Sequence, residues 1–243
     1  ILPLAPMQQG MLFHTLYEQG SGAYVNQLRV DIDGLDPARF RLAWQRVVER
    51  HEMLRSSFCW EGDLAQPLQL VHRAVEVPFE EYDAAQDANH LAATALAQGF
   101  DLAHAPLLRL QLVETGAGQH HLIYTHHHIL MDGWSSSRSI GEVMQHYAGL
   151  ALDAPCVRYR DYIQWLQGQD AAASRAFWEQ QLASLEQPTL LANSLPRPSG
   201  ARGHAEYRHL IERSATQALG EFARARKVTL NTLLQAAWLL LLQ

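Results

Sequence analysis

The chain has 243 residues, of which 48% are hydrophobic and 18% are charged, so it contains enough apolar material for a sizeable core. Its formal net charge of -6 and the lack of a dense Lys/Arg run argue against nucleic-acid binding. The most apolar run, 236–242, is shorter than the roughly 20 residues that a membrane span needs. The two cysteines, Cys59 and Cys156, are far apart and lack metal-ligand spacing, which indicates buried thiols in a reducing compartment and a cytoplasmic protein.

The first part of the chain mixes helical and strand-like patterns. Apolar residues at helical spacing predict a helix over 6–17, and alternating apolar residues predict a strand over 24–32 with one solvated face. Asp36 and Pro37 have the order of an N-cap and a first helical residue, and this helix should run to about Glu49. Short strands at 55–60, 68–72 and 75–79 and a helix at 88–97 are expected to follow.

The strongest strand patterns cover 107–113 and 121–128, and the glycine-containing turn between them predicts a hairpin. Beyond this hairpin we expect helices at 135–147, 159–168 and 171–185, a strand at 207–211, and helices at 215–226 and 229–243. Residues 187–203 are rich in Pro, Ser, Gly and Asn, which is typical of a linker.

These patterns predict an N-terminal α+β lobe over 1–186, a crossing linker over 187–203 and the start of a second lobe over 204–243. The chain begins without Met and stops at Gln243 within an apolar helical pattern that has no closing Gly. We therefore expect a fragment whose second lobe is truncated.

The segment 125–135 reads Thr-His-His-His-Ile-Leu-Met-Asp-Gly-Trp-Ser and continues the second strand of the hairpin. Three interpretations of it are open. His126 and His128 could bind a metal ion with Asp132 as a third ligand. The histidines could instead only satisfy buried hydrogen bonds. The third interpretation is acyl transfer assisted by an imidazole.

Strand geometry limits these interpretations, because successive side chains point to opposite faces. On a strand that includes both residues, His127 and His128 cannot face the same site. One histidine should act in the site and the other should support it.

Five segments resemble motifs of the condensation domains of nonribosomal peptide synthetases. They keep the order of that family and span nearly the whole chain. They are the opening helix Leu4–His14, the Arg-His-Glu-x-Leu-Arg-x-x-Phe segment Arg50–Phe58, the His-His-x-x-x-Asp-Gly segment His127–Gly133, the Tyr-x-Asp-Tyr-x-x-Trp segment Tyr159–Trp165 and the core helix Asn231–Trp238.

The resemblance implies a chloramphenicol acetyltransferase-like fold of class α+β, a mixed sheet with flanking helices, and the beginning of a second similar lobe. It implies that a carrier-bound amino acid attacks an upstream carrier-bound thioester to form an amide. The partners would be two peptidyl carrier domains with phosphopantetheine arms and an adenylation domain in the same polypeptide. The domain itself would bind no cofactor and no metal, and it would bind neither nucleic acid nor membrane.

The resemblance also implies roles for individual residues. His128 and Gly133 would be catalytic, Gly133 by permitting a tight turn that leaves backbone amides for the oxyanion. His127, Asp132 and Arg55 would be supporting residues, with Arg55 a candidate partner of the Asp132 carboxylate. Trp134 and Ser135 are candidates for the substrate tunnel, although core packing of Trp134 and helix capping by Ser135 are simpler interpretations.

Intact histidines argue against the cyclisation subtype, and Gly133-Trp134-Ser135 argues against the epimerisation subtype. The opening segment Pro6–His14 resembles subtypes that join a donor ending in a D-residue to an L-amino acid. Two alternatives stay open: a stand-alone acyltransferase that uses acyl-CoA, and a non-catalytic recruitment domain of the same fold.

Overall fold

The computed structural model describes residues 1–17, 22, 24–153, 157–188, 190–191 and 208–242. It divides into two compact units, Ile1–Gln169 and Asp170–Gln243. The predicted linker 187–203 lies mostly outside the described residues. The predicted lobe boundaries at 186 and 204 therefore remain predictions.

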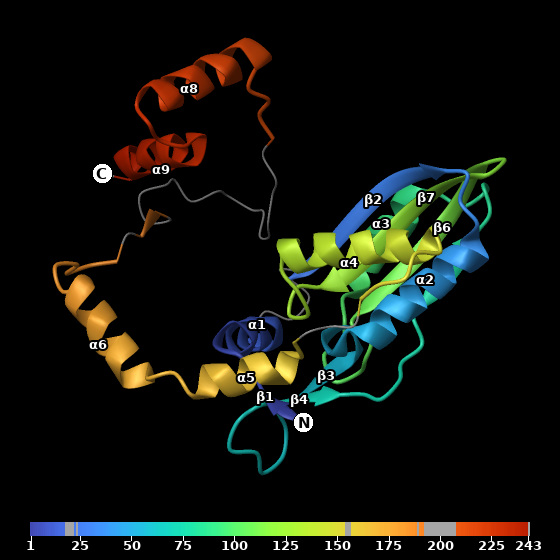
Figure 1. Cartoon of the computed structure of the whole chain (residues 1–243), viewed down its shortest axis with the longest axis horizontal. Helices are drawn as coiled ribbons and strands as arrows, with labels where there is room; N and C mark the ends of the chain where they lie inside the picture. The colour runs from blue at the N-terminus through green and yellow to red at the C-terminus, as the bar shows by residue number, and fades with distance from the viewer. Residues whose placement is uncertain (18–21, 23, 154–156, 189, 192–207, 243) are drawn as a thin grey trace, which may run out of the picture. The chain divides into compact units, whose positions relative to one another are not determined.

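The first unit contains a mixed four-stranded sheet (Figure 1). Its strands lie in the order β2 (Val25–Asp33), β7 (Gln119–His127), β6 (Leu108–Gly116) and β5 (Phe79–Tyr82). The first three strands are antiparallel, whereas β5 runs parallel to β6. The expected hairpin joins β6 to β7 through a turn in which Gly118 has a φ of 75°, a conformation that suits glycine.

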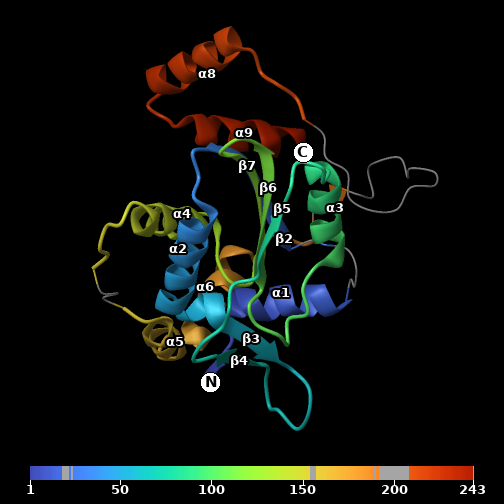
Figure 2. The same cartoon turned by 90° about the vertical axis from the view of Figure 1, so that its right-hand side faces the viewer.

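Helices α2 (Pro37–Arg50) and α4 (Gly133–Tyr147) cover one face of this sheet, and α3 (Ala88–Gln98) covers the other (Figures 1 and 2). Asp36 caps α2 by accepting a hydrogen bond from the Arg39 amide, as predicted.

Side-chain alternation along β7 divides the core between the two faces. Leu122 and Tyr124 belong to the main core, where the Tyr124 ring lies 4.7 Å from that of Trp44 on α2. Ile123 faces the other way and packs with Ala92 of α3. The last residues of β7 are therefore held from both sides.

A second, three-stranded sheet has the order β1 (Leu2–Pro3), β4 (Leu68–Val71) and β3 (Ser56–Cys59). A short 3-10 helix, η1 (Glu52–Arg55), leads into β3. Near this sheet lie α1 (Pro6–Tyr17), whose predicted bounds are confirmed, and α5 (Tyr159–Gln167) (Figure 1).

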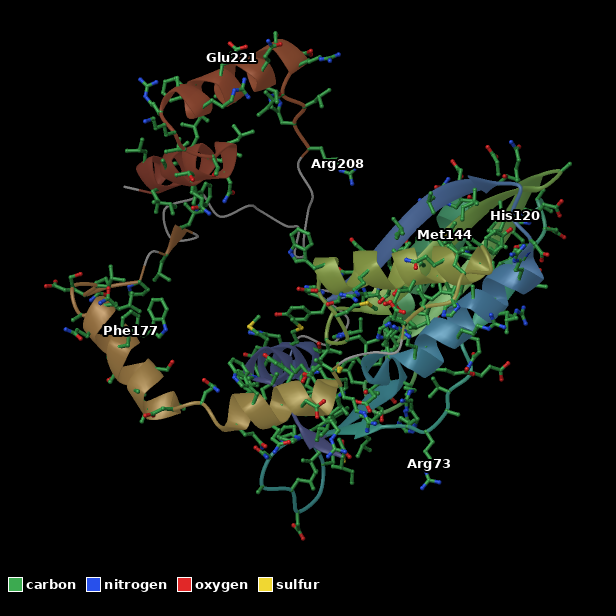
Figure 3. The ribbon with its side chains drawn as sticks, in the orientation of Figure 1. Arg73, His120, Met144, Phe177, Arg208 and Glu221 are labelled. Atoms are coloured by element: carbon green, nitrogen blue, oxygen red, sulfur yellow. The ribbon has the colours of Figure 1, made fainter. Side chains whose placement is uncertain are left out.

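The second unit contains α6 (Ala171–Gln181), α8 (Arg213–Ala225) and α9 (Leu230–Leu241) within its described residues. Large apolar side chains on these helices are exposed, among them Phe177, which Figure 3 labels on α6. Core packing was predicted for Trp178, and for Trp165 on α5, but both side chains are more than half exposed, so that prediction is wrong. No helix in the described ranges is both long and apolar enough to cross a membrane.

The strand predicted at 75–79 is displaced, because pairing with β6 begins only at Phe79. The Gln45 side chain occupies the backbone upstream by donating to the Val75 carbonyl at 2.9 Å and accepting from the Val77 amide at 3.0 Å. Pro78 has no amide hydrogen to offer, and it contributes only its carbonyl, to Leu110.

The strand predicted at 207–211 is also wrong for its described residues, 208–211, which are irregular. A strand requires a hydrogen-bonded neighbour, and the described part of the second unit consists of helices and irregular segments.

Candidate active site

The histidine segment begins within β7 and leaves it at the edge nearest α1. His120, labelled in Figure 3, lies near the start of β7 at the other end of the sheet. His126 is buried and stacks on Tyr124 with ring centroids 4.8 Å apart. Burial, together with the nearby His128, lowers the pKa of His126 to about 4, so this ring stays neutral at neutral pH.

His127 is the last residue of β7 and is 2% exposed. Its Nδ1 accepts a hydrogen bond from the Ile129 amide at 3.1 Å, so the ring hydrogen must be on Nε2. That Nε2 lies 3.3 Å from Oγ1 of Thr15, whose own hydroxyl hydrogen goes to the Met11 carbonyl.

Both nitrogens of His127 are therefore occupied by consistent hydrogen bonds. Burial, together with the neighbouring His128 and His126, lowers the pKa of His127 to about 4. A neutral ring held at both nitrogens has the geometry of a supporting residue.

His128 lies outside β7, in a turn, and is only half-buried. Its amide donates to the Tyr24 carbonyl at 2.7 Å, and its Nδ1 lies 2.9 Å from the Met131 carbonyl. A carbonyl only accepts, so Nδ1 carries the hydrogen and Nε2 is left with a lone pair. Among the described residues Nε2 has no hydrogen-bond partner, which leaves it available to a substrate.

The expectation that strand alternation separates the two histidines therefore needs correction. β7 ends at His127, so alternation does not extend to His128. The two rings differ because the turn that follows the strand uses one in its own hydrogen bonds and leaves Nε2 of the other free.

Asp132 is the N-cap of α4, and its Oδ1 accepts from the Ser135 amide at 2.8 Å. Ser135 is thus the residue that is capped and not the N-cap itself. The hydrogen bond from Ser135 lowers the pKa of Asp132. Core packing of Trp134 is also wrong, because this side chain is 87% exposed.

Gly133 is the first residue of α4, has no positive φ, and has open space where a Cβ would lie. The described residues therefore give no conformational reason for a glycine, and the predicted tight turn is not found there. The amides at this helix start still point toward incoming negative charge.

Arg55 does not meet Asp132. Its Nη1 donates to the His72 carbonyl in the second sheet, while its Nε is buried without a partner among the described residues. None of the ion pairs found in the described ranges includes Asp132.

The metal interpretation would require His126, His128 and Asp132 to converge. In the described part of the chain, no three His, Cys, Asp or Glu side chains come close enough to hold a metal ion.

Three side chains around this site were not singled out from the sequence. Thr15 binds His127, Gln8 binds the Ile129 carbonyl, and buried Glu142 ties α4 to α2 through Arg50 and His51. One signal for Gln8 was available, because Gln8 and Leu12 are four residues apart and form the buried stripe of α1. A polar residue in such a stripe needs partners.

Comparison with known families decides where the chain belongs. The condensation domain family model matches residues 1–243. The chain belongs to the condensation domain family. One relative is a linear gramicidin synthase of Brevibacillus parabrevis, which is 38% identical over 259 residues and matches 100% of this condensation domain. Chondramide synthase cmdD of Chondromyces crocatus is 39% identical over 236 residues and matches 92% of the domain.

The condensation domain spans only 3% and 6% of these two relatives. Among solved structures, the condensation domain of the monacolin K polyketide synthase MokA matches 99% of this chain and 59% of its own, with a TM-score of 0.78 and 22% identity. A chain in the complex of the X-domain and OxyB from teicoplanin biosynthesis has a TM-score of 0.75 and 25% identity, and the match covers 99% of this chain and 56% of that one. The predicted α+β fold of the chloramphenicol acetyltransferase-like type, with a mixed sheet and flanking helices, is confirmed.

Proposed function

We propose that this condensation domain forms amide bonds in nonribosomal peptide synthesis. The observation that carries the proposal is the free Nε2 lone pair of His128, set by the bond from Nδ1 to the Met131 carbonyl. An acceptor at this position can hold an α-amine by one of its N–H groups and aim the nitrogen lone pair at a thioester carbonyl. Membership of the family supports the same reaction.

In the proposed reaction the α-amine of a carrier-bound amino acid attacks the thioester carbonyl of an upstream acyl or peptidyl group. A C–N bond forms, the C–S bond breaks, and the upstream phosphopantetheine arm leaves as a thiol. The proton lost by the amine passes through Nε2 of His128 to the departing sulfur. The helix-start amides of Gly133 and Trp134 are candidate donors to the carbonyl oxygen as it gains charge.

The energetics favour orientation over proton abstraction as the main contribution of His128. An α-amine with a pKa near 8 is about one-tenth neutral at pH 7, a penalty of roughly 1.4 kcal/mol. Positioning can supply about 7–11 kcal/mol, whereas a general base supplies about 3–5 kcal/mol. His127 and Asp132 support the site by holding the turn and the start of α4, and exposed Trp134 and Ser135 are candidates for the tunnel wall.

The partners in this proposal are an upstream and a downstream peptidyl carrier domain and an adenylation domain of the same polypeptide. The opening segment supports a donor that ends in a D-residue and an L-configured acceptor. Arg55 is proposed as a supporting residue of the second sheet and no longer as the partner of Asp132.

The test supplies the intact synthetase with two loaded carriers and measures peptidyl product by mass spectrometry. His128→Ala should abolish the product, whereas His104→Ala, which changes a histidine whose side chain is 81% exposed, should not. Donors ending in D- and L-residues test the subtype, and an acyl-CoA donor tests the acyltransferase alternative. Product from the His128→Ala protein at the wild-type rate would contradict the proposal.

A further inference from the structure

We propose that Gln8 is a positioning residue for His128, acting through the turn 128–131 that carries it. This inference rests on the proposed function, because it assigns a second residue to the same site. It concerns a side chain on α1, 120 positions away from the histidine in sequence. The contacts of Gln8 carry the argument.

Gln8 is 6% exposed, and its amide group has no unused hydrogen-bonding capacity. Oε1 accepts from the Ala5 amide at 3.0 Å and from the Tyr159 hydroxyl at 2.9 Å. Nε2 lies 3.3 Å from Oε1 of Gln69 and 3.4 Å from the Ile129 carbonyl, and it donates to both. One side chain thus joins α1, α5, β4 and the histidine turn.

The orientation of this amide is fixed by its neighbours. The backbone amide of Ala5 can only donate, so the atom facing it must be the oxygen of Gln8. Burial raises the pKa of Tyr159 to about 12, which keeps its hydroxyl protonated and able to donate. The Gln8 nitrogen therefore faces the Ile129 carbonyl, which can only accept.

The contact between Gln8 and Ile129 reaches His128 through the turn itself. The Ile129 amide binds Nδ1 of His127, its carbonyl binds Gln8, and two residues later the Met131 carbonyl binds Nδ1 of His128. Because Ile129 is only 3% exposed, a carbonyl that lost Gln8 would stay unpaired unless the turn opened toward water. Opening the turn moves the Met131 carbonyl, which holds the His128 ring in its orientation.

The other end of the connection is rigid. Gln69 is fully buried on β4 and donates to Oγ of Ser56 at 2.8 Å, and Ser56 in turn donates to the Glu52 carbonyl at 2.8 Å. The turn is therefore fastened to the three-stranded sheet, and not only to a helix that could shift with it.

The experiment compares Gln8→Met and Gln8→Glu with the same two changes at Gln9. Gln9 is the next residue of α1, is exposed and donates through its side chain to the Leu4 carbonyl. Methionine has nearly the length of glutamine and forms none of the four hydrogen bonds. Glutamate keeps both accepting oxygens but has at most one hydrogen to share between Ile129 and Gln69. It serves as the test if the methionine variant does not fold.

Two quantities are measured on each variant that melts as a folded protein. The first is the tautomer of His128, read from the 15N shifts of its ring and assigned with a His128→Gln spectrum. Wild type should be almost wholly the Nδ1–H form, and the Gln8 variants should show a mixture with the Nε2–H form. The second is kcat with loaded carriers, which should fall by about 10- to 100-fold at unchanged KM. The Gln9 variants should match wild type in both measurements.

A general loss of stability would lower the folded fraction without changing the tautomer of the folded molecules, so the two measurements separate positioning from folding. An unchanged tautomer in a folded Gln8→Glu protein would overturn this inference alone. A wild-type synthetase that makes no product from loaded carriers would instead overturn the proposed function, and with it the expected effect on kcat.

Discussion

Glu142 should be a large contributor to the stability of the first unit, although it lies outside both the histidine motif and the turn that follows it. Its side chain is 7% exposed on α4, and its carboxylate lies 2.5 Å from Nε2 of His51 and 3.2 Å from Nε of Arg50. Arg138 is 3.6 Å away but 81% exposed, so it adds little. The informative change is Glu142→Gln, which removes the charge and keeps the shape.

The expected cost follows from the two inner contacts. Hydrogen bonds to charged groups contribute roughly 1.5–3 kcal/mol each, and the amide introduced by Glu142→Gln would retain only one accepting oxygen for two donors. Breaking one partner of a buried ionic cluster costs up to about 3–5 kcal/mol. We therefore expect the free energy of unfolding to fall by about 2–3 kcal/mol at pH 7, measured by urea unfolding.

The effect should depend on pH in a defined direction. Burial raises the pKa of Glu142, but the hydrogen bond from His51 and the nearby positive charges outweigh it, so the pKa lies below its usual value of 4.5. A lowered carboxyl pKa stabilises the fold above about pH 4.5, and this contribution disappears as pH falls through the lowered value. The difference between wild type and Glu142→Gln should shrink accordingly in acid.

The control is Glu81→Gln, which breaks a 2.9 Å ion pair with Arg41 whose side chains are about half exposed. Exposed pairs contribute about 0.2–1 kcal/mol. Equal losses for Glu142→Gln and Glu81→Gln, or a Glu142 effect that is the same at pH 7 and about pH 3, would show that the buried cluster does not act as described.

Three further predictions concern the core and the start of α4. Asp132→Ala should cost about 1 kcal/mol in urea unfolding because α4 loses its N-cap, whereas Asp132→Ser should retain most of that stability; equal losses would argue against capping. Unfolded histidine takes up protons near pH 6.5 and buried His126 only near pH 4, so stability should fall as pH drops between these values, with a shallower slope in His126→Phe. Tyr124→Phe should not destabilise the protein, because the buried hydroxyl has no partner among the described residues; a loss above about 1 kcal/mol would reveal one.

Local sequence signals were sufficient for most of the secondary structure. The cap and proline at 36–37, the hairpin over 107–128 and the helix over 6–17 each depend on neighbouring residues, and all three were found as predicted. The predictions failed where distant residues decide. Gln45 takes the backbone bonds of 75–77, and the predicted strand at 207–211 has no strand to pair with in the described part of its unit.

The sequence alone determined the family and the segment that forms the candidate site, because both are written in short motifs and their order. Only the tertiary structure decided what each motif residue does. Hydrogen bonds from residues more than 100 positions away, Gln8 and Thr15, lock His127 and the turn, and the Met131 carbonyl leaves one nitrogen of His128 free. The same geometry exposes Trp134 and directs Arg55 to His72, since these outcomes depend on which surfaces meet in space and not on spacing along the chain.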